Sequence, residues 1–166
     1  PNIAAEKLYD RSDNGLKASN SWQGYYIILN PEFKASVQWR FINRAIDEIE
    51  NGRVPAVILV CRNSTDTSYF QRLTPYPRVL LRKSSIQFKD YDGKPIGFGI
   101  VIFCLAHTNC SEIYSRFYEK FAEHGELNMP IDKDLMASAE FPKLLQRLRA
   151  QASQFQRDHW IQCEAC

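Results

Sequence analysis

The residues with the clearest chemical potential in this sequence form the short run Asn30-Pro31-Glu32-Phe33. The exocyclic amino group of a nucleobase is a poor nucleophile because its lone pair is delocalised into the ring. The carboxamide oxygen of Asn30 and the backbone carbonyl of Pro31 can accept hydrogen bonds from such an amine, and Phe33 can stack on an extruded base. These residue types indicate chemistry on a base amino group. An asparagine–proline pair is also a common turn after a strand, and this structural role is the alternative.

The five residues before this run, 25–29, carry no charge. Their aromatic, β-branched and aliphatic types are typical of a strand that is buried on both faces. Pro31 ends the strand, because proline lacks the N–H group that a sheet ladder needs. Open α/β sheets bind ligands at the carboxyl ends of their strands, so the sequence predicts a site at this edge.

Downstream, the hydrophobic pattern predicts a helix and then another strand. Apolar residues recur with the helical period from 34 to 51, and Gly52 is a natural helix end. The apolar run 54–61 is typical of a second buried strand, and strand, helix and strand at this spacing predict a βαβ unit. The other expected elements are short strands at 79–81 and 86–88, a hairpin turn at Asp92-Gly93, a strand at 100–105, a helix at 112–123 ended by Gly125, and a helix at 141–155. The predicted fold class is α/β: a Rossmann-like mixed sheet with strands 25–29, 55–61 and 99–105 in its core, a β-hairpin and flanking helices.

Polar residues follow the second predicted strand at the same expected edge of the sheet. Arg62, Asp66 and Thr67 come directly after this strand. Ser64, Thr65 or Asp66 can cap a short helix that begins here, and that structural role is the alternative to a place in the site.

A basic stretch lies between residues 78 and 94, where five basic and two acidic residues give a local net charge of +3. Tyr76 and Tyr91 flank or interrupt it. Basic residues interleaved with aromatic ones can hold a phosphate backbone and stack on bases. A solvated hairpin face would carry the same charges, so both interpretations stay open. The basic residues are Arg78, Arg82, Lys83, Lys89 and Lys94.

Several short motifs follow one another along the first part of the chain. They are Asp13-Asn14-Gly15-Leu16, Trp22-x-Gly24, Asn30-Pro31-x-Phe33, Ser64-Thr65-Asp66-Thr67-x-Tyr69-Phe70, Leu80-Leu81-Arg82 with Ile86-x-Phe88, and Asp92-Gly93-Lys94-Pro95. Over roughly the first 105 residues, their order and spacing resemble the phage-type (Dam-like) DNA adenine-N6 methyltransferase family.

This resemblance implies the Rossmann-like methyltransferase fold and transfer of a methyl group from S-adenosylmethionine to adenine in DNA. It implies catalytic roles for Asn30, Pro31 and Phe33, and it assigns no cofactor-binding residue. The residues expected to contact DNA are Lys34, Arg62, Asp66, Thr67, Arg78, Arg82 and Lys83.

Three features depart from the family pattern. Glu32 stands where the family usually has a second proline, which replaces a fixed backbone angle by a free one and adds a carboxylate. The family's acidic-proline cofactor element would lie before Asn2, and an arginine that the family tends to carry near Ser85 is missing. This chain alone is therefore expected to be inactive even if the domain is an adenine-specific DNA methyltransferase. The alternative function is a catalytically inactive, methyltransferase-like module of a chromatin protein that binds DNA or protein.

Composition excludes some classes of protein. The 166 residues are 45% hydrophobic, enough for one domain with a sizeable core, and the net charge of +2 does not by itself indicate nucleic-acid binding. No apolar run approaches the ~18 residues of a membrane span, so no membrane partner is expected. Five cysteines without framework spacing indicate a reducing, intracellular compartment.

The last residues differ from the rest of the chain. Cys163 and Cys166 form a C-x-x-C pair, half of a four-cysteine zinc site. With Trp160 and Gln162 before it, this pair resembles the opening of a CW-type zinc finger of chromatin proteins. The expected organisation is a methyltransferase-like domain at 1–156, without its cofactor element, and a tail at 157–166 that begins a zinc finger. This implies zinc, a chromatin partner and a nuclear location.

Overall fold

The computed structural model describes residues 5–10, 12–83, 86, 88–89, 93–107, 111–130 and 146. Contacts divide the chain into two units, 1–130 and 131–166, and all the elements below belong to the first. The strands are β1 (Ile27–Leu29), β2 (Ala56–Arg62), β3 (Arg78–Leu81), β4 (Ile100–Ala106) and β5 (Gly125–Asn128). The helices are α1 (Ala35–Glu50), α2 (Ser68–Leu73), α3 (Ser111–Phe121) and a 3-10 turn, η1 (Ala122–His124). The predicted helix 141–155 and the tail 157–166 lie outside the described residues, apart from residue 146.

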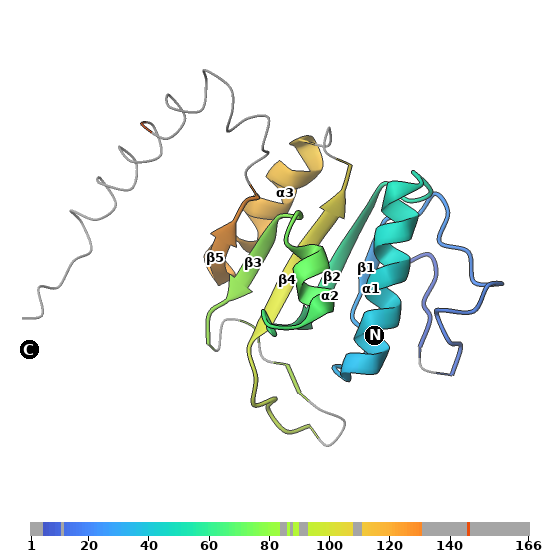
Figure 1. The fold of residues 1–166 in the computed structure, drawn as a ribbon, viewed down its shortest axis with the longest axis horizontal. Coiled ribbons are helices and arrows are strands. Elements are labelled where there is room, and N and C mark those ends of the chain that lie inside the picture. Colours follow the sequence, from blue (N-terminus) through green and yellow to red (C-terminus); the bar gives the residue numbers. More distant parts are fainter. Residues whose placement is uncertain are drawn as a thin grey trace, which may run out of the picture. The chain divides into compact units, whose positions relative to one another are not determined.

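The five strands form one mixed sheet in the order β1-β2-β4-β3-β5 (Figure 1). β1 and β2 are parallel and joined by α1, whereas β4 runs antiparallel to both β2 and β3, and β5 antiparallel to β3. The α/β class and the mixed sheet are confirmed, and this open arrangement is compatible with a Rossmann-like fold. Because β1, β2 and β3 point the same way, their carboxyl ends share one edge of the sheet, the lower edge in Figure 1.

Helices cover both faces of the sheet. Figure 1 shows α1 and α2 in front of it and α3 behind. Ile42 and Ile46 of α1 pack in one apolar cluster with Leu59 of β2 and Phe103 of β4. Phe117 of α3 belongs to the cluster on the other face. Every residue of β4 is buried, because this strand has a neighbour on each side and a helix over each face.

The prediction that 25–29 forms a central strand buried on both faces is wrong. β1 stands at the end of the sheet among the described strands, and it is shorter than expected. Ile27 and Leu29 pack toward α1, but Tyr26 is 73% and Ile28 60% exposed on the opposite face. A central strand buried on both faces and an edge strand with one exposed apolar face can have the same composition. The sequence pattern therefore could not distinguish between them.

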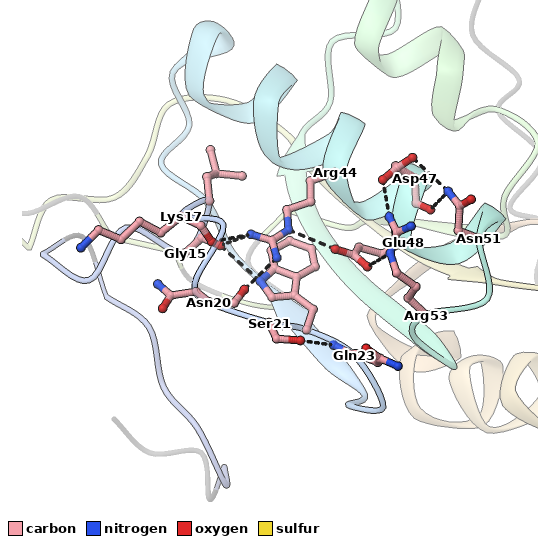
Figure 2. A network of polar contacts seen from close by, with 12 residues as sticks. Gly15, Lys17, Asn20, Ser21, Gln23, Arg44, Asp47, Glu48, Asn51 and Arg53 are labelled. Carbon is pink, nitrogen blue, oxygen red and sulfur yellow. Dashed lines mark hydrogen bonds and ion pairs between the residues drawn. The ribbon is translucent and has the colours of Figure 1, made fainter.

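A polar network fixes the loop at residues 12–22 to the middle of α1 (Figure 2). The Arg44 guanidinium donates to the Gly15 carbonyl at 2.8 Å and to the Asn20 carbonyl at 2.7 Å. The Trp22 indole N–H also donates to the Gly15 carbonyl, at 3.2 Å. Glu48 accepts from both Arg44 and Arg53. The network therefore sets where the chain enters β1.

The segment predicted to form a short strand and a hairpin differs from the expectation. Residues 86 and 88 belong to no strand, and among the described residues the predicted hairpin shows one isolated bridge, between Lys89 and Pro95. Gly125 ends the helical segment as predicted, because it is the C-cap residue of η1, and it also begins β5. A Cβ at Gly125 would lie 2.2 Å from the Leu80 carbonyl oxygen, so glycine is required here by the close approach to β3.

Candidate functional site

A hollow of about 280 Å³ opens at the carboxyl ends of β1 and β2. The loop from β1 to α1 supplies one wall and the loop from β2 to α2 supplies the other. The structure thus brings together four of the predicted site residues from two loops that are far apart in sequence: Phe33 from the first loop, and Arg62, Asp66 and Thr67 from the second. The full lining is Phe33, Ala35, Arg62, Ser64, Asp66, Thr67 and Tyr69.

Asn30 and Pro31 lie at the predicted place, directly after β1. Asn30 is exposed, and its carboxamide has no hydrogen bond with another described residue. Pro31 is buried, which anchors the backbone next to that amide. Neither residue lines the hollow itself. The amide oxygen is therefore available to accept a hydrogen bond from a ligand at this edge.

The Phe33 ring is held by two other phenylalanines. It meets Phe98 edge to face, with centroids 5.3 Å apart, and Phe88 at 6.2 Å. The Arg62 guanidinium lies over the Phe98 ring, 4.8 Å from its centroid. Edge-to-face contacts fix the tilt of a ring, so Phe33 presents a set orientation to the hollow.

The structural alternative for the loop after β2 is not observed. Thr67 occupies the N-cap position of α2, and its side chain makes no capping hydrogen bond. The Thr67 hydroxyl instead donates to the Ser64 carbonyl at 2.7 Å. Asp66 is not the N-cap residue of α2, and it lines the hollow together with Arg62.

The N-terminus of α1 places a partial positive charge at the carboxyl edge of the sheet. Lys34 is the N-cap residue, no side chain caps the helix, and no acidic residue lies in its first turn. The unpaired N–H groups and the macrodipole of a 16-residue helix make this end locally positive. One turn further in, Gln38 is fully buried and neither amide atom has a partner among the described residues.

The basic residues expected to contact DNA divide into two groups. Lys34 and Arg62 lie at the edge of the hollow, and Arg82 and Lys83 follow β3 at the same edge of the sheet. Arg78 does not join them. Arg78 is the first residue of β3 and pairs with Phe103 of β4, which pairs in turn with Leu59 of β2. Leu59 lies three residues before Arg62, so Arg78 is about 10 Å from Arg62 along the strand direction. The Arg78 guanidinium contacts the Thr74 carbonyl at 3.4 Å.

The sequence reasoning missed the role of Phe98. Phe98 lies between Gly97 and Gly99 just before a predicted strand, and no function was expected for its side chain. In the structure this ring links Phe33 to Arg62. The available signal was an apolar side chain that comes back to the carboxyl edge just before a buried strand.

Among the described residues, no group of three or more His, Cys, Asp or Glu side chains could hold a metal ion, and the predicted zinc ligands Cys163 and Cys166 fall outside them. No helix in the described part of the chain is both long and apolar enough to cross a membrane.

Comparison with known proteins gives no relative. No family model, curated protein or solved structure matches this chain.

Proposed function

We propose that this chain is a DNA adenine-N6 methyltransferase domain. One observation carries the proposal: an exposed asparagine amide and a buried proline follow β1 beside a hollow walled by a fixed phenylalanine. Acceptors for an amino group and an aromatic face for its ring are what chemistry on adenine N6 requires. The motif order described above adds the substrate class.

In this proposal the residues act mainly by positioning. The Asn30 amide oxygen and the Pro31 carbonyl accept the two N–H groups of the adenine amine, which localises the nitrogen lone pair. Phe33, held by Phe98, stacks on the base. Lys34 and Arg62 contact phosphates that flank the extruded nucleotide. No covalent enzyme intermediate is needed, so correct placement of the reacting nitrogen accounts for most of the rate.

The methyl donor would be S-adenosylmethionine, which supplies an activated methyl group. No described residue is assigned to the methyl donor. The acceptors and aromatic ring of this edge suit the base rather than the donor. We therefore assign to these residues the adenine part of the site.

The second candidate is an inactive methyltransferase-like module that binds DNA or protein. Glu32 favours it, because an exposed carboxylate stands beside Asn30 where the family usually has a second proline. In this case Lys34, Arg62, Arg82 and Lys83 would form a surface that binds DNA without chemistry.

A transfer assay separates these functions. The chain is incubated with methyl-labelled S-adenosylmethionine and an adenine-containing duplex, and label in the DNA is counted. We expect transfer by the protein with its cofactor element in place, and a loss of at least about a hundredfold for Asn30→Ala in that protein, as when one preorganised polar group is removed from an active site. Asn128→Ala, at the far side of the sheet, is the control. Full activity of folded Asn30→Ala would refute the catalytic role. DNA binding without any transfer would establish the second candidate.

A further inference from the structure

The outer side of β1 is an open sheet edge. β1 ends the strand order among the described residues, and none of their backbone hydrogen bonds joins its outer side to another segment. Unpaired N–H and C=O groups along such an edge form a template for another strand. Tyr26 and Ile28 are exposed on the same face of this edge, although both are large and apolar.

An apolar groove continues from that face to α3. It holds about 470 Å³, and its floor and walls are formed by Tyr26, Ile58, Ile113, Phe117 and Phe121. Three charged residues of α3 border it. Glu112 accepts from Arg116 at 2.7 Å, whereas Lys120 forms no ion pair with another described residue. The groove is therefore apolar, and the Lys120 ammonium group at its rim has no ion-pair partner among the described residues.

We propose that the outer edge of β1, together with this groove, binds an extended strand supplied by a partner polypeptide. The open backbone edge selects a β-strand rather than a helix, because only an extended chain can pair with its N–H and C=O groups. Every second side chain of that strand is apolar and covers Tyr26 and Ile28. A carboxylate of the strand faces Lys120.

The added strand would complete the crevice in which Asn30 lies. In open α/β sheets, ligands bind between the carboxyl ends of neighbouring strands where the chain direction around the sheet reverses. Among the described residues no segment lies beyond β1, so they flank Asn30 on the β2 side alone. A partner strand would supply a second wall beside Asn30. This consequence rests on the proposed function, whereas strand binding itself does not.

The test uses the ¹⁵N-labelled full chain and a synthetic ten-residue peptide of alternating valine and threonine with a glutamate near one end. We expect the outward-facing amides of β1 to shift and to exchange more slowly with solvent on titration. Ile28→Lys should weaken binding at least tenfold, and Leu127→Lys on β5, at the other end of the sheet, should not. Lys120→Glu should reverse the preference, so that a lysine-containing version of the peptide binds better.

Other outcomes overturn the inference. Saturating peptide without protection of β1 amides, or equal weakening by Leu127→Lys, would exclude strand pairing at this edge. Binding of a helical peptide in the groove while the β1 amides stay unprotected would mean that the occupant is a helix. A concentration-dependent dimer in sedimentation that Ile28→Lys abolishes would mean that the occupant is a second copy. Strand binding with no methyl transfer would count against the proposed function alone.

Discussion

The rings of Phe33 and Phe98 meet edge to face, with centroids 5.3 Å apart and planes at 76°. Phe33 belongs to the loop after β1, and Phe98 precedes β4, which lies two strands away in the sheet. This contact ties two segments that meet only at the carboxyl edge. Because the Arg62 guanidinium lies over the Phe98 ring, the same contact also positions the Arg62 side chain beside the hollow.

Phe98→Ala should therefore affect the site more than the fold. We expect the free energy of unfolding to fall by about 1–2 kcal/mol, less than for a fully buried phenylalanine because Phe98 is half-buried. Methyl transfer should fall by more than the loss of folded protein explains, since Phe33 is freed. Chemical denaturation and the labelled transfer assay measure the two effects. Phe121→Ala, in the same apolar cluster but on α3, is the control and should cost stability without this excess loss.

Glu32→Pro should raise transfer activity. The exposed carboxylate beside Asn30 is removed and the backbone between Pro31 and Phe33 becomes stiffer. The Glu32 N–H makes no backbone hydrogen bond to another described residue, so proline removes none there. The melting temperature should stay the same or rise. Glu32→Ala separates the charge from the stiffness. Unchanged transfer with both variants would mean that Glu32 does not limit the reaction.

Arg44→Ala should destabilise the chain far more than Arg116→Ala. Both arginines pair with a glutamate four residues away on a helix, but the Arg44–Glu48 side chains are 17% and 10% exposed and the Arg116–Glu112 side chains 74% and 78%. Arg44 also stacks on Trp22 at 4.2 Å and holds two carbonyls of the 12–22 loop. We expect a loss of about 2–4 kcal/mol for Arg44→Ala and at most about 0.5 kcal/mol for Arg116→Ala, by urea denaturation. Equal losses would show that the loop network adds nothing.

Cys61 should make stability fall at high pH. Burial in the core raises the pKa of Cys61 from 9.0 to about 12. Between these two values the unfolded thiol releases its proton and the folded thiol keeps it, so the unfolded state is favoured increasingly as pH rises. Below pH 9 this contribution to instability is absent. The free energy of unfolding should drop by up to about 1.4 kcal/mol per pH unit in this window. Cys61→Ala should remove that part of the slope, and an unchanged slope would contradict the burial of the thiol.

The sequence alone determined the parts of the fold that depend on local patterns. The 3.6-residue period located α1, and uninterrupted apolar runs located β2 and β4. Burial of one helix face, or of both faces of a strand, requires apolar residues at regular positions within a single segment, so it is visible in the sequence of that segment. The order Asn30-Pro31-x-Phe33 after a strand placed these residues at a carboxyl edge. That placement follows from strand direction alone, so no knowledge of neighbouring strands was needed.

Only the tertiary structure decided which segments lie beside one another. It put β1 at the end of the sheet, with Ile28 exposed, although its composition is that of a central strand. It began β5 at Gly125, brought Phe98 to Phe33, and left Arg78 away from the hollow. The physical reason is that the hydrophobic pattern of a segment indicates how much of that segment is buried. Which segments become its neighbours depends on long-range packing, and the pattern of a single segment contains no information about that packing.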